Sequence, residues 1–259
     1  MANEDGKAQQ ELLDLRQGID TLDEEVLRLL SRRAQLAHRI GEIKQGNLYR
    51  PEREAQVLRR IAERNPGPLP EGAVRTIFRE IMSACLALEQ PLRIAYFGPA
   101  GTFTESAAKK HFGSAPTFTS HVAIDDVFRA VESGNADYGV VPVENSTEGA
   151  VGRTLDLLLT TPLMICGEVG LRIQQNLMSK SAAVDRLDKL YSHAQSLAQC
   201  HEWLNRHLPA IPRVPVASNA EAARLAAADP SSGAVAGEAA AQLYELNILA
   251  ANIEDDPNN

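Results

Sequence analysis

The sequence predicts a chain of two domains, an all-α domain over residues 1–91 followed by an α/β domain over residues 92–259. The length of 259 residues, with 44% hydrophobic and 23% charged residues, is a globular composition sufficient for one or two domains. Before Pro91 the apolar residues follow a helical spacing. After it, strand-like and helix-like segments alternate.

The charge balance and the cysteine pattern exclude several classes of protein. Lys and Arg number 26 and Asp and Glu number 34, a net charge of −8, which disfavours nonspecific binding to nucleic acid or to an acidic membrane surface. Cys85, Cys166 and Cys200 form no Cys-x-x-Cys pair, a pattern that indicates a reducing compartment and no metal or disulfide framework. Because no apolar leader or membrane-length apolar run occurs, we expect a cytoplasmic protein.

The all-α domain begins with a long predicted helix from Leu12 to Ile43. Its apolar residues step by three and four in an almost unbroken heptad seam, and the helix is about 50 Å long at 1.5 Å per residue. Two shorter helices follow, at residues 51–61 and 74–88, on either side of a proline-rich break at residues 65–70. Since two short helices cannot cover this seam, we expect it to be buried against a second copy of the chain.

Three cations lie on one side of the long helix. Arg33 occupies a seam position where the spacing requires a leucine, Lys44 lies three turns further on, and Arg16 lies near the other end. An unpaired guanidinium in an apolar seam is costly, so either a salt bridge to a neighbouring acid or a bound anion explains Arg33. Arg16 and Arg33 are about 25 Å apart along one helix, but an antiparallel partner helix brings its Arg16 to Arg33 and Lys44. Guanidinium groups bind carboxylates through paired hydrogen bonds, so the pattern favours two composite anion sites in a dimer.

The helical domain resembles the all-helical chorismate mutase family over about residues 11–90. The resemblance is carried by Leu12-Leu-Asp-Leu-Arg16, Ile19-Asp-x-Leu-Asp23, Leu29-Leu-x-x-Arg33, Gly41-x-x-Lys44 and Arg53-Glu54. It implies an interlocked helical homodimer that rearranges chorismate, a dicarboxylate, to prephenate without a cofactor or a metal.

The same resemblance assigns roles to individual residues. Arg33 and the partner chain's Arg16 hold the two carboxylates, Lys44 and a later polar residue hold the ether oxygen, and Glu54 holds a substrate hydroxyl. Arg53 matches a further substrate-binding position of the family.

The third helix departs from the enteric members of this family at two positions. Those members have a Ser and, four residues later, a Gln, where this sequence has Cys85 and Glu89. A carboxylic acid donates a hydrogen bond to the ether oxygen only when it is protonated. We therefore hypothesise that Glu89 is protonated in the occupied dimer, or that activity falls as the pH rises. The alternative is that Glu89 is an exposed residue at the end of a helix.

After Pro91 the sequence alternates between strands and helices. We expect strands at residues 92–97, 138–143, 163–169, 189–191 and 214–216, and helices at residues 102–112, 124–133, 154–159, 196–206 and 220–228. Capping boxes, Thr102-Phe-Thr-Glu105 and Ser218-Asn-Ala-Glu221, open two of these helices. Elements in this order predict a mostly parallel α/β layer whose ligands lie at the carboxyl ends of strands.

Five motifs of the second domain resemble, in their order, the prephenate dehydratase family from about Arg93 to the last residue. They are Gly98-Pro-Ala-Gly-Thr-Phe103, Val141-Pro-Val-Glu-Asn-Ser-Thr-Glu-Gly149, Ser192-His-Ala-Gln195 with Gln199-Cys200, Ser218-Asn-Ala-Glu-Ala-Ala223 and Gly237-Glu238. A P-loop is excluded because no Gly-Lys-Ser/Thr is present, and no dinucleotide fingerprint follows the first strand.

This second resemblance implies two α/β lobes around a cleft, similar to a periplasmic binding protein, in which prephenate loses carbon dioxide and hydroxide to give phenylpyruvate. Neutral donors at strand and loop ends are the candidate prephenate-binding residues, although each of them alone is also typical of a cap or a turn: Thr102, Asn145, Ser146, Ser192, Gln195, Ser218 and Asn219. His193, Cys200, His201 and His207 fit no common zinc spacing, so we expect no metal and no cofactor.

In this family a segment like Asn258-Asn259 is followed by a strand that begins Thr-Arg-Phe, whose Thr is the main catalytic residue, and then by a small regulatory domain that binds an amino acid. Neither lies within this sequence. We therefore expect a truncated dehydratase domain with little or no dehydratase turnover and no feedback by phenylalanine, beside a working mutase.

Two other classes of protein stay open at this point. The first is a module that binds a small carboxylate without converting it, fused to a helical dimerisation domain. The second is a coiled-coil interaction protein, which explains the heptad seam but not Arg16, Arg33 and Lys44. Product analysis with chorismate and with prephenate separates these classes from the enzyme.

Overall fold

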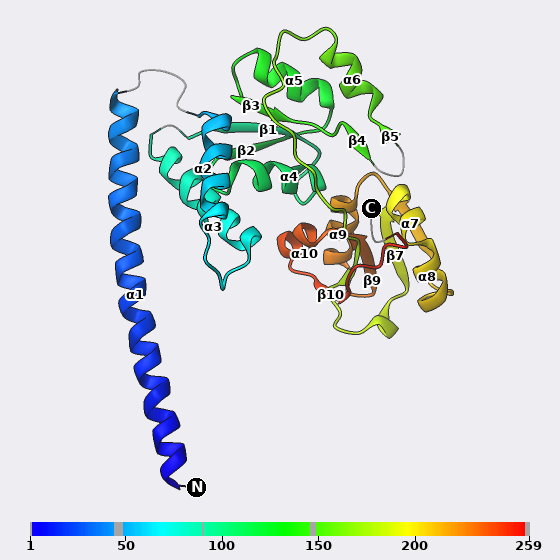
Figure 1. The fold of residues 1–259 in the computed structure, drawn as a ribbon. Coiled ribbons are helices and arrows are strands. Elements are labelled where there is room, and N and C mark those ends of the chain that lie inside the picture. The colour runs from blue at the N-terminus through cyan, green and yellow to red at the C-terminus, as the bar shows by residue number, and fades with distance from the viewer. Residues whose placement is uncertain (1, 44–48, 90, 146–148, 257–259) are drawn as a thin grey trace. The chain divides into compact units, whose positions relative to one another are not determined.

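The computed structural model describes residues 2–43, 49–89, 91–145 and 149–256. The chain divides into two compact units, one of helices alone over Met1–Pro91 and one of strands and helices over Leu92–Asn259 (Figure 1). Within the described ranges, no helix is both long and apolar enough to cross a membrane.

The described residues of the first unit form three helices: α1 (Ala2–Ile43), α2 (Pro51–Glu63) and α3 (Glu71–Ala87). The first begins at Ala2, earlier than the predicted start at Leu12. Pro51 opens α2, a position where its missing N–H costs nothing. The two short helices pack against each other and bury Leu58 and Val74, and α3 also contacts α1.

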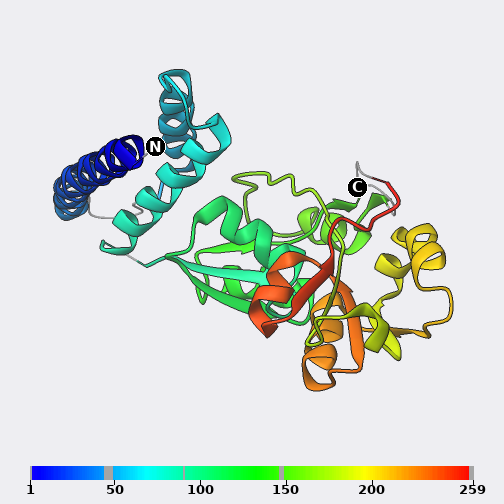
Figure 2. The same ribbon diagram turned by 90° about the horizontal axis from the view of Figure 1, so that it is seen from below.

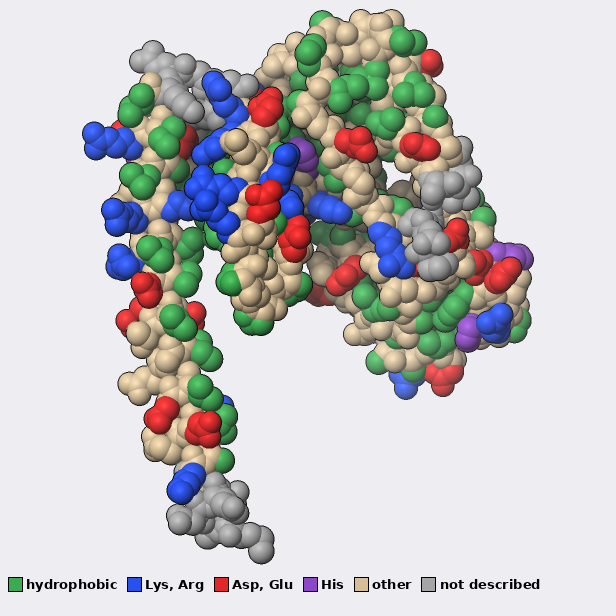
Figure 3. Space-filling view, viewed as in Figure 1, with side chains coloured by type: hydrophobic (Ala, Val, Ile, Leu, Met, Phe, Trp, Pro, Cys, Tyr) green, Lys and Arg blue, Asp and Glu red, His purple; other side chains and the backbone are tan. Residues whose placement is uncertain are grey.

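The apolar seam of α1 lies uncovered in the single chain. Its nine apolar side chains are between 50% and 74% exposed: Leu12, Leu15, Ile19, Leu22, Val26, Leu29, Leu36, Ile40 and Ile43. Figure 3 shows hydrophobic side chains in green at many points along this helix. A monomeric protein rarely exposes an apolar stripe of this length, so α1 has the surface of a helix that packs against another chain.

The second unit contains two lobes, each built on its own sheet. The first sheet consists of β1 (Arg93–Phe97), β2 (Thr117–His121) and β3 (Tyr138–Val140) in the order β2-β1-β3, all parallel. Figure 1 shows α4 (Phe103–Phe112) and α5 (Ile124–Glu132) on opposite sides of this sheet. Both faces of the central strand are therefore covered, which is why Ile94, Ala95 and Tyr96 are all buried.

A short hairpin and a connecting segment lead from the first lobe to the second. The hairpin is β4 (Glu144–Asn145) and β5 (Gly149–Ala150), and α6 (Gly152–Leu158) follows it. The strand predicted at residues 163–169 is wrong: this segment runs without strand pairing, and Met164 and Ile165 are 88% and 74% exposed. Its apolar residues resemble a strand in sequence, but no neighbouring strand covers them within the described chain.

The second sheet has five strands in the order β10-β6-β9-β7-β8. Its members are β6 (Asn176–Ser179), β7 (Lys189–His193), β8 (Arg213–Val216), β9 (Ser232–Ala236) and β10 (Asn247–Ala250), with a 3-10 turn, η1 (Val184–Arg186), between the first two. β7 runs parallel to β8 and β9, whereas β6 is antiparallel to both of its neighbours. The expectation of a mostly parallel layer therefore holds for the first lobe but not for this edge of the second.

Helices cover both faces of the second sheet, as Figure 2 shows with α7 (Ala194–Gln199) and α8 (His201–His207) in yellow and α9 (Asn219–Ala228) and α10 (Glu238–Tyr244) in orange and red. Leu177 and Val235 pack in one cluster, and their strand neighbours Met178 and Ala234 pack in the other, because side chains alternate across a sheet. The single helix predicted at residues 196–206 is wrong, since Cys200 breaks it into α7 and α8.

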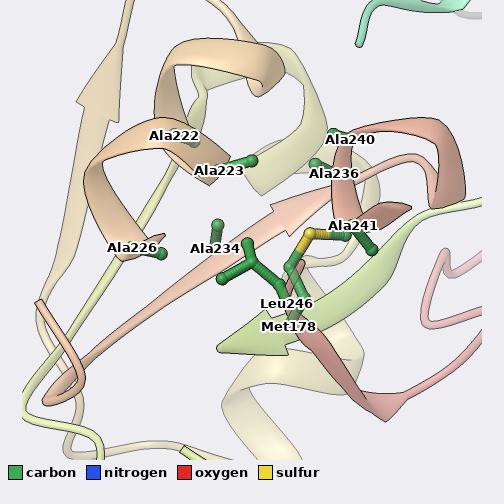
Figure 4. Packing of buried hydrophobic residues seen from close by; sticks show 9 residues of the cluster. All are labelled: Met178, Ala222, Ala223, Ala226, Ala234, Ala236, Ala240, Ala241 and Leu246. Atoms are coloured by element: carbon green, nitrogen blue, oxygen red, sulfur yellow. The ribbon is translucent and has the colours of Figure 1, made fainter. Parts of the chain in front are cut away.

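Small side chains allow α9 and α10 to lie close to the sheet (Figure 4). Nine buried residues form this cluster, and seven of them are alanines: Met178, Ala222, Ala223, Ala226, Ala234, Ala236, Ala240, Ala241 and Leu246. Close packing of this kind fixes the start of α9, where Ser218 and Asn219 lie, relative to the carboxyl end of β7.

Candidate active sites

Arg33 is directed onto the third helix of its own unit. Its Nη1 donates a hydrogen bond to Cys85 Sγ at 2.9 Å, the Arg33 side chain is half-buried and Cys85 is buried. Within the described residues Arg33 forms no salt bridge, so a neutral thiol, not an acid, is its partner there. A thiol does not neutralise a guanidinium, and Arg33 therefore keeps its charge for an anion.

Glu89 lies against the bare backbone of α1 at Gly41. A Cβ atom at position 41 would fall 2.5 Å from Glu89 Oε2 and 2.8 Å from its Cδ, so a larger residue there would have to displace this flexible carboxyl group. Arg33 and Gly41 on α1 thus face Cys85 on α3 and Glu89 just after α3, two pairs along one contact between the helices. Lys44, the third predicted cation, lies outside the described residues.

Glu54, in the first turn of α2, lies between two groups that favour its charged form. Arg79 on α3 holds Nε 3.6 Å from Glu54 Oε1, with 25% and 18% of the two side chains exposed, and Tyr49 donates a hydrogen bond to the same carboxylate. The pKa of Glu54 is nevertheless raised, because the loss of solvent around the buried carboxylate outweighs Arg79 and Tyr49.

Arg53 faces another side of α2. It is exposed, and its Nη1 donates to Gln56 Oε1 at 2.6 Å. It also lines a cavity of about 610 Å³ between α2 and α3, together with further arginines and several apolar side chains: Arg53, Val57, Arg60, Ile61, Arg64, Asn65, Pro66, Val74 and Phe78. The structure of one chain therefore does not bring Arg53 to Arg33.

Arg16 is the most distant of the predicted mutase residues. It is exposed on α1, 17 residues before Arg33, a separation of about 25 Å along a helix. In the single chain Arg33, Cys85 and Glu89 lie where α1 contacts α3 and the turn that follows it. Arg16 is exposed on α1, away from this contact.

The loop after β1 is held by the capping box at the start of α4. Thr102 Oγ1 accepts from the Glu105 N–H at 3.5 Å and donates to the Pro99 carbonyl at 3.0 Å, while Glu105 Oε2 accepts from the Gly101 N–H at 2.6 Å. Asn145 lies on β4, where it pairs with Gly149 on β5, and Ser146 lies outside the described residues. Thr102 and Asn145 are both partly exposed.

A junction between the two lobes brings this loop to the second sheet. A Cβ atom at Gly237 would lie 2.7 Å from the ring of Phe103, and one at Gly101 would lie 3.4 Å from the Ala240 backbone. Gly101 also has a φ of 85°, in the left-handed region that favours glycine. The glycines of the first and last predicted dehydratase motifs thus allow these two motifs to touch.

The predicted residues of the second lobe form a partly buried chain of hydrogen bonds. Asn219 Oδ1 accepts from the His193 N–H at 3.0 Å, and Asn219 Nδ2 donates to Ser196 Oγ at 2.7 Å. Ser192 Oγ lies 3.0 Å from Asn219 Oδ1 and 2.7 Å from the Val235 carbonyl, and its single proton serves one of them at a time. Ser192 has no exposed surface, so it fixes Asn219 from inside the protein.

Gln175 and Ser196 extend this chain, although sequence reasoning did not select them. Gln175 is buried, and its Nε2 donates to Ser196 Oγ at 2.9 Å. Its backbone N–H donates to Glu254 Oε2 at 2.8 Å, which ties the segment after β10 to the same cluster. Neither residue belongs to a recognisable motif; the only signal is that Ser196 directly follows Ser192-His-Ala-Gln195.

Gln195 and Ser218 lie at the starts of α7 and α9. The Nε2 atom of Gln195 is buried without a hydrogen-bond partner among the described residues, so this donor is available to another group. Ser218 Oγ accepts from the Glu221 N–H at 3.1 Å and caps α9, as the capping box predicts.

The histidines of this lobe take part in packing and local hydrogen bonds. His207 stacks on Trp203 with ring centroids 4.3 Å apart, and His201 Nε2 lies 2.8 Å from Asn205 Nδ2. Over the part of the chain that the structure describes, no group of three or more His, Cys, Asp or Glu side chains is placed to hold a metal ion.

Comparison with protein-family models identifies both halves of the chain. Residues 15–90 match the model of chorismate mutase type II, and residues 94–259 match the model of prephenate dehydratase. These two matches confirm the resemblances that the sequence motifs carry.

Whole-chain relatives combine the same two domains. A bifunctional chorismate mutase/prephenate dehydratase of Neisseria gonorrhoeae is 57% identical over 252 residues, covering 96% of this chain and 70% of the relative. One of Pseudomonas aeruginosa is 52% identical, covering 97% of this chain and 71% of the relative. Among solved structures, the prephenate dehydratase of Arthrobacter aurescens in complex with L-Phe is 32% identical with a TM-score of 0.60, covering 65% of this chain and 57% of that one. This likeness confirms the predicted architecture of the α/β unit.

Proposed function

The chain belongs to the bifunctional chorismate mutase/prephenate dehydratase family, and from this membership we propose that its helical unit rearranges chorismate to prephenate and that its α/β unit takes this prephenate as the substrate of the dehydratase reaction. The two domains serve consecutive steps in the synthesis of phenylalanine. The observation that best supports the first activity is Arg33, a cation at a leucine position that faces Cys85 and no acid among the described residues.

The rearrangement requires orientation and positive charge. A sigmatropic rearrangement transfers no proton, so the protein has to hold a compact conformer of the dicarboxylate and place cations where negative charge develops on the breaking ether bond. A million-fold acceleration corresponds to about 8 kcal/mol, which these two effects have to supply. In this proposal Arg33 binds a carboxylate of the substrate and Lys44 binds the ether oxygen. Glu54 and Arg53 contact the polar substituents of the substrate, and Cys85 lines the site.

The mutase site needs a second copy of the chain. Arg16 stands about 25 Å from Arg33 within one chain, whereas an antiparallel α1 of a partner presents its Arg16 to the first chain's Arg33. The exposed apolar seam supports a homodimer, because packing α1 against a partner helix removes that seam from water. We place this homodimer in the cytoplasm, since none of the three cysteines, all of them described, is in a disulfide and the substrates are metabolites.

Glu89 is the proposed donor to the ether oxygen. It packs on Gly41, on the same contact between α1 and α3 as Arg33 and Cys85, and only its protonated form can donate. Mutase activity of the natural chain should therefore fall as the pH rises, while Glu89→Gln, whose amide donates at every pH, should show a flatter profile. Identical pH–rate profiles for the two proteins would contradict this role.

In the α/β unit we propose that prephenate binds where the Gly98–Phe103 loop meets the carboxyl ends of the second sheet. Thr102, Asn145, Ser146, Gln195, Ser218 and Asn219 are the proposed binding residues. Ser192 is proposed to act through Asn219, because it is buried and bonded to that side chain. No cofactor is required for either unit in this scheme.

Product analysis tests the proposal. The full chain is incubated with chorismate, and prephenate is measured; prephenate is then supplied alone, and its binding and the formation of phenylpyruvate are measured separately. Prephenate formation at a rate typical of an enzyme is the expected result for the helical unit. Binding of prephenate without phenylpyruvate would favour the alternative in which the α/β unit only binds a carboxylate, and no reaction with chorismate would contradict the mutase.

A further inference from the structure

Glu54 and Arg79 form a contact between α2 and α3 that no motif of the sequence indicates. The Nε–Oε1 distance of 3.6 Å is that of an ion pair but is too long for a hydrogen bond. Arg79 Nε is buried and has no hydrogen-bond partner among the described residues. The charge of Arg79 has a larger effect on Glu54 than the side-chain hydrogen bond that the guanidinium group also makes to this carboxylate.

We propose that Arg79 is a positioning residue of the mutase site, which holds the Glu54 carboxylate from the α3 side so that it can accept a hydrogen bond from the substrate hydroxyl. This inference rests on the proposed function, because it takes Glu54 as the group that contacts the substrate. Tyr49 donates to the same carboxylate, so Glu54 is held by the loop before α2 and by α3 together. A carboxylate fixed by two neighbours loses little freedom when the substrate binds.

The surroundings of Glu54 predict what happens without Arg79. Burial raises the pKa of Glu54, and the groups that act against this rise are Arg79 on α3 and Tyr49 on the preceding loop. The neighbouring arginines are engaged elsewhere: Arg53 donates to Gln56, and Arg75 pairs with Glu71 at 2.7 Å. Burial raises the pKa of Glu54, and the charge of Arg79 lowers it. Without this charge the pKa of Glu54 rises further, so the carboxylate is protonated up to a higher pH.

The test is the pH dependence of mutase kcat/KM in the full chain. Arg79→Gln should move the acid limb of the profile upward by about one pH unit, a tenfold loss in the middle of that limb that disappears at higher pH. Arg79→Lys, which keeps the charge, should restore most of the natural profile. Arg75→Gln, the same change one turn earlier on α3 at a residue paired with Glu71, should leave the profile unchanged.

Two results would overturn the role of Arg79, and a third would overturn the role of Glu54. If Arg79→Gln lowers kcat/KM equally at every pH together with the melting temperature, Arg79 only supports the fold and the inference is overturned. An unchanged profile overturns it as well. If Glu54→Gln keeps full activity, the proposed role of Glu54 itself fails, whatever Arg79 does. Arg79→Met is a second charge-free variant with a similar side-chain length, for use if Arg79→Gln does not fold.

Discussion

The two units place their candidate site residues in opposite ways. In the helical unit the residues are charged, they lie on helix surfaces, and Arg16 stands far from Arg33 in the same chain. In the α/β unit they are neutral, and Ser192, Ser196 and Asn219 are already bonded to one another inside the protein. The difference indicates that a helical surface can share a site between two chains, whereas a sheet and its helices complete a network within one chain.

The physical reason lies in what each architecture can bury. A long helix with two short companions is covered over only part of its length, so Arg16 stays exposed on α1 while Arg33 is half-buried against Cys85. The second sheet has helices on both faces, and strand ends there deliver polar side chains directly into a covered space.

The largest effect is expected from removing the charge of Arg33. Arg33→Gln should lower mutase kcat by about 10²–10³-fold, because it deletes a cation aimed at developing negative charge. Arg32→Gln, at the exposed neighbouring position, removes the same charge and should change kcat little. The measurement is chorismate turnover alongside the oligomeric state. If Arg33→Gln alters only the stability of the dimer, the helical unit is an interaction domain and not a mutase. The two units would then not be two different ways of building an active site.

A large effect on assembly is expected from a charge in the seam of α1. Leu22 is 61% exposed in one chain, and Leu22→Glu places a carboxylate in the proposed interface of both copies. Because burying a leucine contributes about 1.5–3 kcal/mol and the interface contains it twice, the dimer should dissociate at least about a hundredfold more readily. Gln17→Glu on the opposite face of the helix is the control. In Leu22→Glu the sedimentation coefficient and the mutase activity should fall together. Prephenate binding by the α/β unit should not change.

A substitution in the α/β unit should have the opposite pattern of effects: prephenate binding weakens, and mutase activity stays the same. Asn219→Ala removes a side chain that bonds His193 and Ser196, and it should lower the free energy of unfolding of this unit by about 1–3 kcal/mol. It should also weaken prephenate binding and leave the mutase rate unchanged. Asn205→Ala, which removes solvent-exposed hydrogen bonds to His201 and Arg213, should cost less, about 0.5–1 kcal/mol. Thermal unfolding and prephenate titration measure both effects, and a loss of mutase activity in Asn219→Ala would contradict the separation of the two units.

The sequence predicts the helical unit better than the α/β unit, and β9 shows why. Periodicity places α1, α2 and α3, because one face of each helix is apolar and the other is polar. Ser232–Ala236 has no such signal, since every residue of that strand is small and buried and helices cover both faces. The reverse error occurs at residues 163–169, where apolar residues suggest a strand but lie exposed.

The candidate site residues follow the same division. Arg33 is noticeable in a sequence because a charge interrupts an apolar seam. Gln175 and Ser196 are not, because a neutral polar residue acquires its meaning only when the fold surrounds it with partners such as Asn219. Arg79 lies between these cases: its charge is visible on the third helix, but only the packing of α2 on α3 brings it to Glu54.

The smallest effect is expected at Gly41, and it separates stability from activity in the helical unit. An alanine inside a helix is favoured over glycine by up to about 1 kcal/mol, so both Gly41→Ala and Gly18→Ala should stabilise α1 or leave its stability unchanged. A Cβ atom at Gly18 meets nothing within 4 Å, whereas at Gly41 it meets Glu89 Oε2 at 2.5 Å and has to move that flexible carboxyl group. Mutase kcat should therefore fall by up to about tenfold in Gly41→Ala alone, with a melting temperature no lower than that of the natural chain. Full activity in Gly41→Ala would show that the position of Glu89 does not matter to the reaction, and equal losses in both variants would assign the effect to α1 as a whole.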